Sequence, residues 1–302
     1  MFEVWVPITI AAAFAQNARS ALQKYLKGRL TTLGAAYVRF LYAWPFAVLY
    51  VVALQGWGGM ALPEANGLFL LYSVAGGLCQ IIFTGLLITL FSFRNFAVGT
   101  TFSKIEVVQV AILGLVILGD TLTATATLAI AVAATGVIAL SVGQTKITVA
   151  SLFTSLAEKP TLIGLASGAF LGGSVVFFRG AALALGYDGF VMAAAFTLAV
   201  SVVIQTAIMG VYLAFREPAT LKDVIVHWRG SLAVGIAGVL ASIGWFTAFT
   251  IQNAAYVRAL GQIELVFTFA VSVFFFRERT SRVEVLGIGL VVAGILILIL
   301  GR

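Results

Sequence analysis

The chain has 302 residues, of which 62% are hydrophobic and 10% are charged, and its formal net charge is +7. Soluble domains carry about 25% charged residues, so this composition excludes a water-soluble globular fold and indicates helices surrounded by lipid. The basic residues lie mostly in short segments between apolar runs, a distribution typical of membrane topology, which argues against nucleic acid binding.

Ten apolar runs are long enough to cross a bilayer, for which about 17–25 residues are needed. In the first half we predict spans over Val4–Leu22, Leu33–Leu54, Gly67–Phe91, Phe96–Leu118 and Thr125–Val142. In the second half we predict spans over Thr161–Leu185, Phe190–Phe215, Ser231–Ile251, Tyr256–Phe276 and Glu284–Leu300. The predicted fold class is therefore all-α integral membrane.

The two halves repeat one sequence pattern at a shift of 158 positions. The anchors of the repeat are Asn95 with Asn253, Ile105-Glu106 with Ile263-Glu264, Asp120 with Glu278, Gly136 with Gly294 and Gly143 with Gly301. With five spans in each half, the second half must enter the membrane from the opposite side. We therefore predict ten transmembrane helices as two inverted five-helix repeats, residues 1–145 and 161–302, joined by a linker over 146–160.

Lysine and arginine predict the orientation of the chain. The loops after the odd-numbered spans hold Lys24, Lys27, Arg29, Arg94, Lys146, Lys159, Arg216, Lys222, Arg229, Arg277, Arg279 and Arg282, whereas the loops after the even-numbered spans hold none. Because basic loops stay in the cytoplasm, both termini are predicted to be periplasmic.

Glycines at four-residue spacing predict a close contact on the sixth span. Gly164, Gly168 and Gly172 lie on one face of that helix. Such a face lets another helix approach closely. The functional alternative is a ligand that approaches the glycine backbone.

Charged residues inside apolar spans are candidates for function, since a charge at the bilayer centre costs about 2.5–3.5 kcal/mol on insertion scales and persists where it has a partner or faces a cavity. The bases are Arg19, Arg39, Lys104, Arg179 and Arg258, and the acids are Glu106 and Glu264. Charges at the ends of spans, such as Asp120 and Glu284, are interpreted as helix-terminal charges.

The repeat is symmetric in its buried acids and asymmetric in its bases. Glu106 matches Glu264, whereas Lys104 matches Gln262. Lys104 and Glu106 are two positions apart and point in different directions, so each is expected to find its partner on another helix. The acids either pair within the bundle or exchange a proton during transport, because a carboxyl group removed from water holds its proton more readily.

Five deep bases against two deep acids favour an anionic or zwitterionic solute with a carboxylate or phosphate, if most of these groups line one cavity. The candidate substrate-binding residues are Arg19, Arg39, Lys104, Arg179, Trp245, Arg258 and Gln262, and the proton-coupling candidates are Glu106 and Glu264. For Arg19 and Arg39 the alternative is that their side chains extend to the nearby membrane interface.

Two short motifs carry a resemblance to a known family. They are Ile105-Glu106-Val107-Val108 followed by Leu118-Gly119-Asp120-Thr121, and Ile263-Glu264-Leu265-Val266 followed by Phe276-Arg277-Glu278. With these motifs, and with Arg39 in an aromatic setting, the chain resembles the drug/metabolite transporter superfamily, in particular the EamA group of bacterial exporters. The resemblance implies a bacterial inner membrane protein that moves amino acids, nucleobase-like metabolites, sugar phosphates or drugs through a central cavity between the halves.

We predict a secondary transporter, an exporter of small polar metabolites such as amino acids, that works by alternating access with protons as the candidate coupling ion. The alternative is an organic-anion or phosphate-ester exchanger. No ATP-binding glycine-rich motif is present. An enzyme is not expected, because the only histidine, His227, lies in a loop, and no cofactor or metal site is expected beside the single Cys79.

The loop charges give a testable topology. A reporter fused after residue 302 should show strong alkaline phosphatase activity, because the C-terminus is predicted to be periplasmic. Members of the resembling group commonly keep both termini in the cytoplasm, so fluorescence from a reporter that folds only in the cytoplasm would contradict the prediction.

Overall fold

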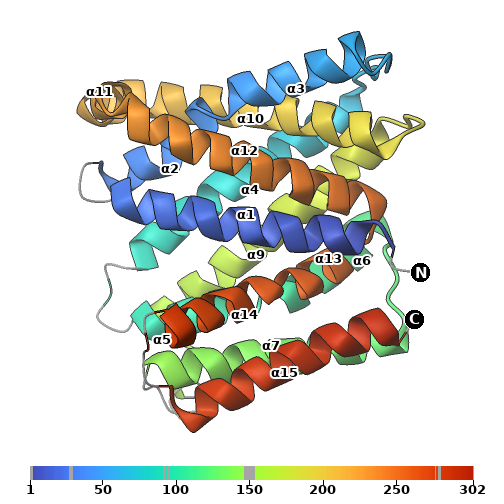
Figure 1. The fold of residues 1–302 in the computed structure, drawn as a ribbon. Coiled ribbons are helices and arrows are strands. Elements are labelled where there is room, and N and C mark those ends of the chain that lie inside the picture. Colours follow the sequence, from blue (N-terminus) through green and yellow to red (C-terminus); the bar gives the residue numbers. More distant parts are fainter. Residues whose placement is uncertain are drawn as a thin grey trace. The chain divides into compact units, whose positions relative to one another are not determined.

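The computed structural model describes residues 3–26, 30–90, 93, 96–145, 154–275, 277 and 280–301, and within these ranges all regular structure is helical, as predicted (Figure 1). The helices of the first half are α1 (Trp5–Leu26), α2 (Thr32–Leu41), α3 (Trp44–Gly56), α4 (Gly67–Leu90), α5 (Phe96–Ser103), α6 (Glu106–Leu118) and α7 (Ala124–Thr145). Those of the second half are α9 (Lys159–Ala184), α10 (Phe190–Arg216), α11 (Pro218–Val226), α12 (Trp228–Ile251), α13 (Ala254–Gly261), α14 (Ile263–Ala270), the π-helix η1 (Val271–Phe275) and α15 (Arg282–Leu300).

Nine segments of the described chain are long and apolar enough to cross a membrane, and they coincide with the second to tenth predicted spans. The first predicted span forms α1, which has 22 residues but is not among these nine. The count of ten spans therefore stays a prediction. Of the repeat anchors and loop bases, those outside the described residues are Lys27, Arg29, Arg94, Asn95, Lys146, Glu278 and Arg279.

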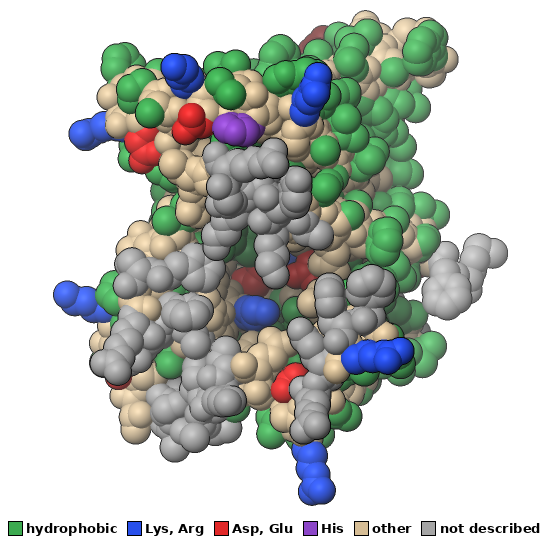
Figure 2. Space-filling model, turned by 60° about the vertical axis from the view of Figure 1, so that its left-hand side comes forward, with side chains coloured by type: hydrophobic (Ala, Val, Ile, Leu, Met, Phe, Trp, Pro, Cys, Tyr) green, Lys and Arg blue, Asp and Glu red, His purple; other side chains and the backbone are tan. Residues whose placement is uncertain are grey.

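Large apolar side chains cover much of the surface. Leu71, Val116 and Leu128 are exposed by 62%, 75% and 56%. In the view of Figure 2, hydrophobic side chains cover much of the right-hand side. Monomeric soluble proteins rarely expose apolar surface on this scale, whereas helices in contact with lipid must. Together with the nine apolar helices, this surface identifies a multi-pass membrane protein.

The helices form two compact units, and each unit takes segments from both sequence repeats. Unit 1 contains residues 1–81 and 177–252, and unit 2 contains residues 82–176 and 253–302. The boundaries fall inside α4 and α9, so these two helices contribute to both units. The compact units are thus not the two sequence repeats.

Within unit 1, α12 is the helix that joins the others. It packs along α1 and also against α2, α3 and α10 (Figure 1). Gly235 and Gly244 make these contacts close, because a Cβ atom there would lie 2.5 Å from Tyr42 and 2.7 Å from Ala12. The absence of a side chain at these positions allows the backbones to approach.

Within unit 2, α7 and α15 lie side by side and run in opposite directions (Figure 1). Gly143 near the end of α7 meets Glu284 near the start of α15, and Thr125 near the start of α7 meets Gly301 beyond the end of α15. These helices begin at Ala124 and Arg282, which are 158 positions apart. Equivalent helices of the two sequence repeats are therefore antiparallel, as an inverted repeat requires.

The glycines of this contact are reciprocal. A Cβ atom on Gly136 would lie 2.7 Å from the Gly287 carbonyl oxygen and 2.6 Å from the Val291 nitrogen. A Cβ atom on Gly294 would lie 2.8 Å from the Ala129 oxygen and 2.8 Å from the Ala133 nitrogen. Each residue of the first contact is related to one of the second by 158 positions: Gly136 to Gly294, Gly287 to Ala129, and Val291 to Ala133. The two helices thus use the same surface toward one another, as in a two-fold contact.

Three of the predicted spans are present but are interrupted within the span. The second span divides into α2 and α3 where Pro45 enters the first turn of α3, since proline donates no backbone hydrogen bond. The fourth divides into α5 and α6, and the ninth into α13, α14 and η1. A continuous apolar pattern does not reveal such breaks. The short helix α11, predicted as part of a loop, was also missed.

The contact of α7 with α15 predicts unequal effects of two neighbouring glycines. Gly287→Ala should destabilise the protein by about 1–3 kcal/mol, because the new Cβ would lie 2.5 Å from the Leu140 nitrogen. Gly289→Ala is the matched control, with nothing within 4 Å of its Cβ position, and should cause no loss since alanine favours helices. Thermal unfolding in detergent measures both, and equal effects would contradict the packing.

Candidate functional site

The breaks of the fourth and ninth spans fall at matching positions of the repeat. α5 ends at Ser103 and is followed by Lys104. α13 ends at the equivalent position, Gly261, and is followed by Gln262. At the first break the N–H groups of Lys104 and Ile105 donate to carbonyls three residues back, at 3.2 Å each. At the second break the N–H of Gln262 donates to Ala259 at 3.3 Å. Such 3₁₀ turns inside helices often mark functional positions.

The glycine face of α9 packs against the first break, all within unit 2. A Cβ atom on Gly164 would clash with the backbone of Gly99, and one on Gly168 would lie 2.8 Å from the Ser103 carbonyl oxygen. Gly172 lies against Val110 of α6. This face is therefore occupied by the broken span, which supports the packing interpretation over a ligand on the glycine backbone.

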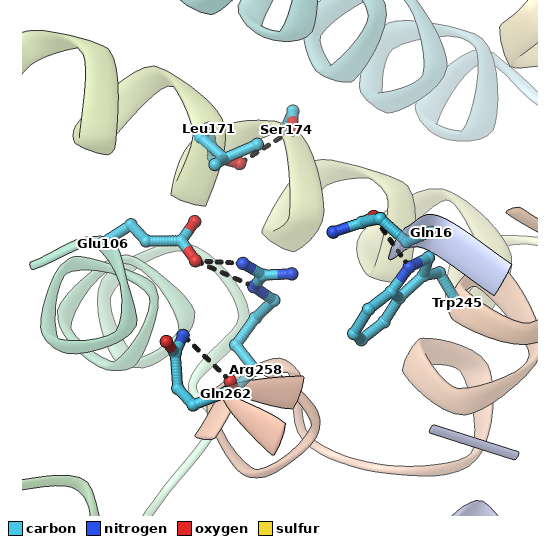
Figure 3. Close-up of polar contacts among 7 residues, drawn as sticks. All are labelled: Gln16, Glu106, Leu171, Ser174, Trp245, Arg258 and Gln262. Atoms are coloured by element: carbon cyan, nitrogen blue, oxygen red, sulfur yellow. Dashed lines mark hydrogen bonds and ion pairs between the residues drawn. The ribbon is translucent and has the colours of Figure 1, made fainter. Parts of the chain in front are cut away.

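The centre of the site is an ion pair between Glu106 and Arg258 (Figure 3). Both side chains are buried, with 5% and 10% of their surface exposed. The guanidinium donates from Nε to Glu106 Oε1 at 3.1 Å and also from Nη2 to the same oxygen. As expected, the partner of Glu106 comes from another segment, the last turn of α13.

The second carboxylate oxygen of Glu106 is buried without a hydrogen-bond partner among the described residues. A buried anionic oxygen without a donor is unfavourable, because it has lost water and gained nothing in return. The geometry thus leaves an acceptor for one further donor, such as a proton, an ammonium group or a water molecule. The orphaned oxygen is the chemically incomplete atom of this site.

Lys104 and Glu264 extend the charged cluster of unit 2. Both are partly buried, and the charges of Glu264 and Glu106 both act on Lys104. The charge of Glu264 also acts on Arg258. Two bases, Lys104 and Arg258, and two acids, Glu106 and Glu264, therefore balance within this cluster. The amide nitrogen of Gln262 donates to the Arg258 carbonyl at 3.4 Å, next to the second helix break (Figure 3).

The remaining predicted binding residues, Arg19, Arg39, Arg179 and Trp245, belong to unit 1. Arg179 donates from Nη1 to the carbonyl oxygens of Phe249 and Gln252, at 2.7 Å each. These carbonyls lie at the C-terminal end of α12, where a basic side chain stabilises the helix. The contact gives Arg179 a structural role.

Trp245 belongs to a polar contact between α12 and α1. Its indole Nε1 donates to Gln16 Oε1 at 3.0 Å (Figure 3), and its ring stacks on Phe249 at a centroid distance of 5.7 Å. Three of the five predicted bases therefore belong to unit 1, whereas both predicted acids belong to unit 2. Whether these residues bind a solute stays a prediction.

Sequence reasoning did not select three glutamines that the structure places in polar contacts. Besides Gln16, the buried Gln205 of α10 donates to Gln80 of α4 at 2.6 Å, within unit 1. An amide inside an apolar span is the signal that could have identified them, because a buried amide needs a partner. Among the described residues no group of His, Cys, Asp or Glu could hold a metal ion.

Comparison with known proteins agrees with this architecture. Residues 159–300 match the model of the EamA-like transporter family, which confirms the resemblance seen in the sequence. A solved structure titled only "Crystal structure of protein" is similar with a TM-score of 0.72 at 12% identity, over 99% of this chain and 98% of that chain. At this identity the likeness shows the fold alone. No curated protein matches the chain.

The ion pair predicts a strong and non-additive effect on stability. Arg258→Ala should destabilise the protein by about 3–5 kcal/mol, because it leaves the Glu106 carboxylate buried without its partner. Adding Glu106→Gln to that variant should restore part of the loss. Unfolding of the two single variants and the double variant in detergent measures the coupling. Glu64→Gln, at an exposed acid, is the control. Strictly additive losses would contradict a direct pair.

Proposed function

We propose that the protein is a secondary transporter, an exporter of small polar metabolites such as amino acids, that works by alternating access. The observation that carries the proposal is the charge-balanced cluster of Lys104, Glu106, Arg258 and Glu264 at two helix breaks inside membrane-spanning segments. Charged groups inside a membrane mark solute and ion pathways, and broken helices form the binding sites of many transporters built from inverted repeats. We place the protein in the bacterial inner membrane with both termini periplasmic.

The arrangement of charge favours a solute with both signs. Glu106 and Arg258 neutralise each other directly, whereas Lys104 and Glu264 are the partly exposed members of the cluster. A lysine ammonium suits a solute carboxylate, and a glutamate carboxylate suits a solute ammonium. An amino acid presents both groups a few ångströms apart.

The alternative function is an organic-anion or phosphate-ester exchanger. The net charge of +7 and the three arginines of unit 1 support it. Counterflow in liposomes separates the alternatives. An amino acid transporter exchanges labelled amino acids and ignores phosphate esters, whereas an anion exchanger does the reverse.

We also propose that transport is coupled to protons, and that Glu106 or Glu264 is the acid that binds and releases the proton. Each lies beside a helix break, where a change of the local backbone would alter its access to water. The orphaned oxygen of Glu106 is a place for a proton. Protonation there would weaken the bond to Arg258 and so link proton binding to the contact between α6 and α13.

Transport by reconstituted protein tests the coupling. Changing the coupling acid, Glu106 or Glu264, to Gln should retain the fold and solute exchange but abolish uptake driven by a pH gradient, since an amide carries no transferable proton. Lys104→Ala should instead weaken solute binding, by about ten- to hundredfold if it holds a carboxylate. Lys222→Ala, at an exposed site of α11, is the control. Unchanged gradient-driven transport in the Glu106→Gln, Glu264→Gln double variant would rule proton coupling out.

A further inference from the structure

The start of α7 is capped in part by another helix. The Thr123 side chain accepts a hydrogen bond from the Ala126 N–H at 3.2 Å, which satisfies one donor of the first turn. The backbone N–H of Thr123 donates to the hydroxyl oxygen of Tyr256 at 3.4 Å, and the two hydroxyl oxygens are 3.3 Å apart. Tyr256 belongs to α13, so the N-terminus of α7 uses a partner from a different segment of unit 2.

The equivalent position of the repeat, the start of α15, is capped within its own first turn. Ser281 lies 158 positions after Thr123, and its backbone N–H donates to the side chain of Glu284 at 3.2 Å. The N–H of Glu284 donates to the Ser281 hydroxyl in return, which completes a capping box. α7 has Ala126 at the position of Glu284, and an alanine side chain accepts no hydrogen bond. The hydroxyl of Tyr256 therefore replaces the missing capping side chain.

The helix that carries Tyr256 also carries Arg258 of the candidate site. All eight residues of α13 are buried, and the helix packs against α6, α7 and α15. Its first turn is bonded to α7 by Tyr256, and its last turn is bonded to α6 by the ion pair of Arg258 with Glu106. The two side chains are two positions apart, about 3 Å along the helix axis, and point in different directions. Because both lie on one short helix, a movement that separates Tyr256 from α7 also moves Arg258.

The first repeat has no equivalent of these two contacts among its described residues. Val98 of α5 is at the position of Tyr256, and Thr100 is at the position of Arg258. Valine has no polar side-chain atom and threonine has no charge, so neither residue reproduces the corresponding contact. Since α7 and α15 are antiparallel, their first turns lie at opposite faces of the membrane. The contact of Tyr256 with Thr123 therefore strengthens one face only.

This contact lies where the interior of unit 2 meets the surface. Tyr256 is 8% exposed, whereas Thr123 is exposed. The loop between the fourth and fifth spans, which contains Thr123, carries no lysine or arginine. In the topology proposed above, this face is therefore periplasmic.

We propose that the hydrogen bond between Tyr256 and Thr123 is a latch that holds the periplasmic face of unit 2 closed, and that α13 must separate from α7 before the pair of Glu106 and Arg258 opens toward that face. The inference rests on the proposed alternating access. Tyr256 acts through Arg258 and is a positioning residue. Loss of one such hydrogen bond shifts an equilibrium between closed and open states by about three- to tenfold.

The test measures opening directly and needs no solute. The full-length protein, with Cys79→Ser and Ala254→Cys, is treated in detergent with a water-soluble maleimide. Ala254 is fully buried at the start of α13, so a cysteine there reacts only when the helix moves. Tyr256→Phe keeps the ring and removes the hydroxyl, and it should speed the labelling by about three- to tenfold. Tyr212→Phe, at a tyrosine that is 51% exposed, is the matched control and should leave the rate unchanged.

A second cysteine distinguishes a latch from a general loss of stability. Ala194, in α10 of unit 1, is also buried. Tyr256→Phe should leave the labelling of Ala194→Cys unchanged, whereas loss of a residue needed only for stability would speed the labelling at both positions. Thr123→Ser retains the capping oxygen and the hydroxyl, so it should behave like the wild type. If Ala254→Cys does not fold, amide hydrogen exchange of α13 in protein without an introduced cysteine gives the same comparison.

Each outcome decides the proposal. Faster labelling at Ala254→Cys alone supports the latch. A protein that shows this result but exchanges no amino acid in the counterflow experiment keeps the latch and loses the proposed solute. Equal acceleration at both cysteines, an unchanged rate in Tyr256→Phe, or the absence of labelling at Ala254→Cys with and without the Tyr256 hydroxyl overturns the latch.

Discussion

Water is absent from the core of a bilayer, so each charge and each backbone polar group inside it must be satisfied by the protein itself. The ion pair of Glu106 and Arg258 is the central instance in unit 2, because it joins α6 to α13 beside the points where both spans are broken. The helix breaks meet the same requirement, because backbone N–H groups there donate hydrogen bonds to carbonyl oxygens three residues back. In unit 1 the charged side chain of Arg179 is satisfied by hydrogen bonds to carbonyl oxygens at the C-terminal end of α12.

Helices in a membrane must also pack closely against one another, because lipid provides no hydrophobic force that would drive them together. Gly136 and Gly294 admit the backbones of α15 and α7 in a reciprocal contact, and the glycine face of α9 admits the broken fourth span. These contacts use small residues at points where a single methyl group would collide with backbone atoms. The broken fourth span thus packs closely against the unbroken α9, and this contact lies beside the charges at its break.

The chemistry of the site departs from the symmetry of the repeat. Glu106 and Glu264 are equivalent in sequence, but the position equivalent to Arg258 is occupied by Thr100. The direct ion pair of Glu106 therefore has no counterpart in the first repeat. Under the alternating access proposed above, this difference would make the two conformations unequal in energy.

Several features could be predicted from the sequence alone. The composition determined a helical membrane protein, the hydropathy pattern located nine apolar segments that the structure contains, and the glycine spacing located the close face of α9. The sequence also selected Glu106 and Arg258 as deep charges that need partners. These properties are local, because length, apolar character and residue spacing act along one helix at a time.

Only the tertiary structure decided which partners meet. It paired Glu106 with Arg258 across 152 positions of sequence, and it placed the Arg179 side chain on the last carbonyls of α12. It also interrupted three spans that the apolar pattern left continuous. Partner choice depends on which faces of distant helices come into contact, and breaks depend on hydrogen bonds that compete within a few residues. A one-dimensional pattern records neither.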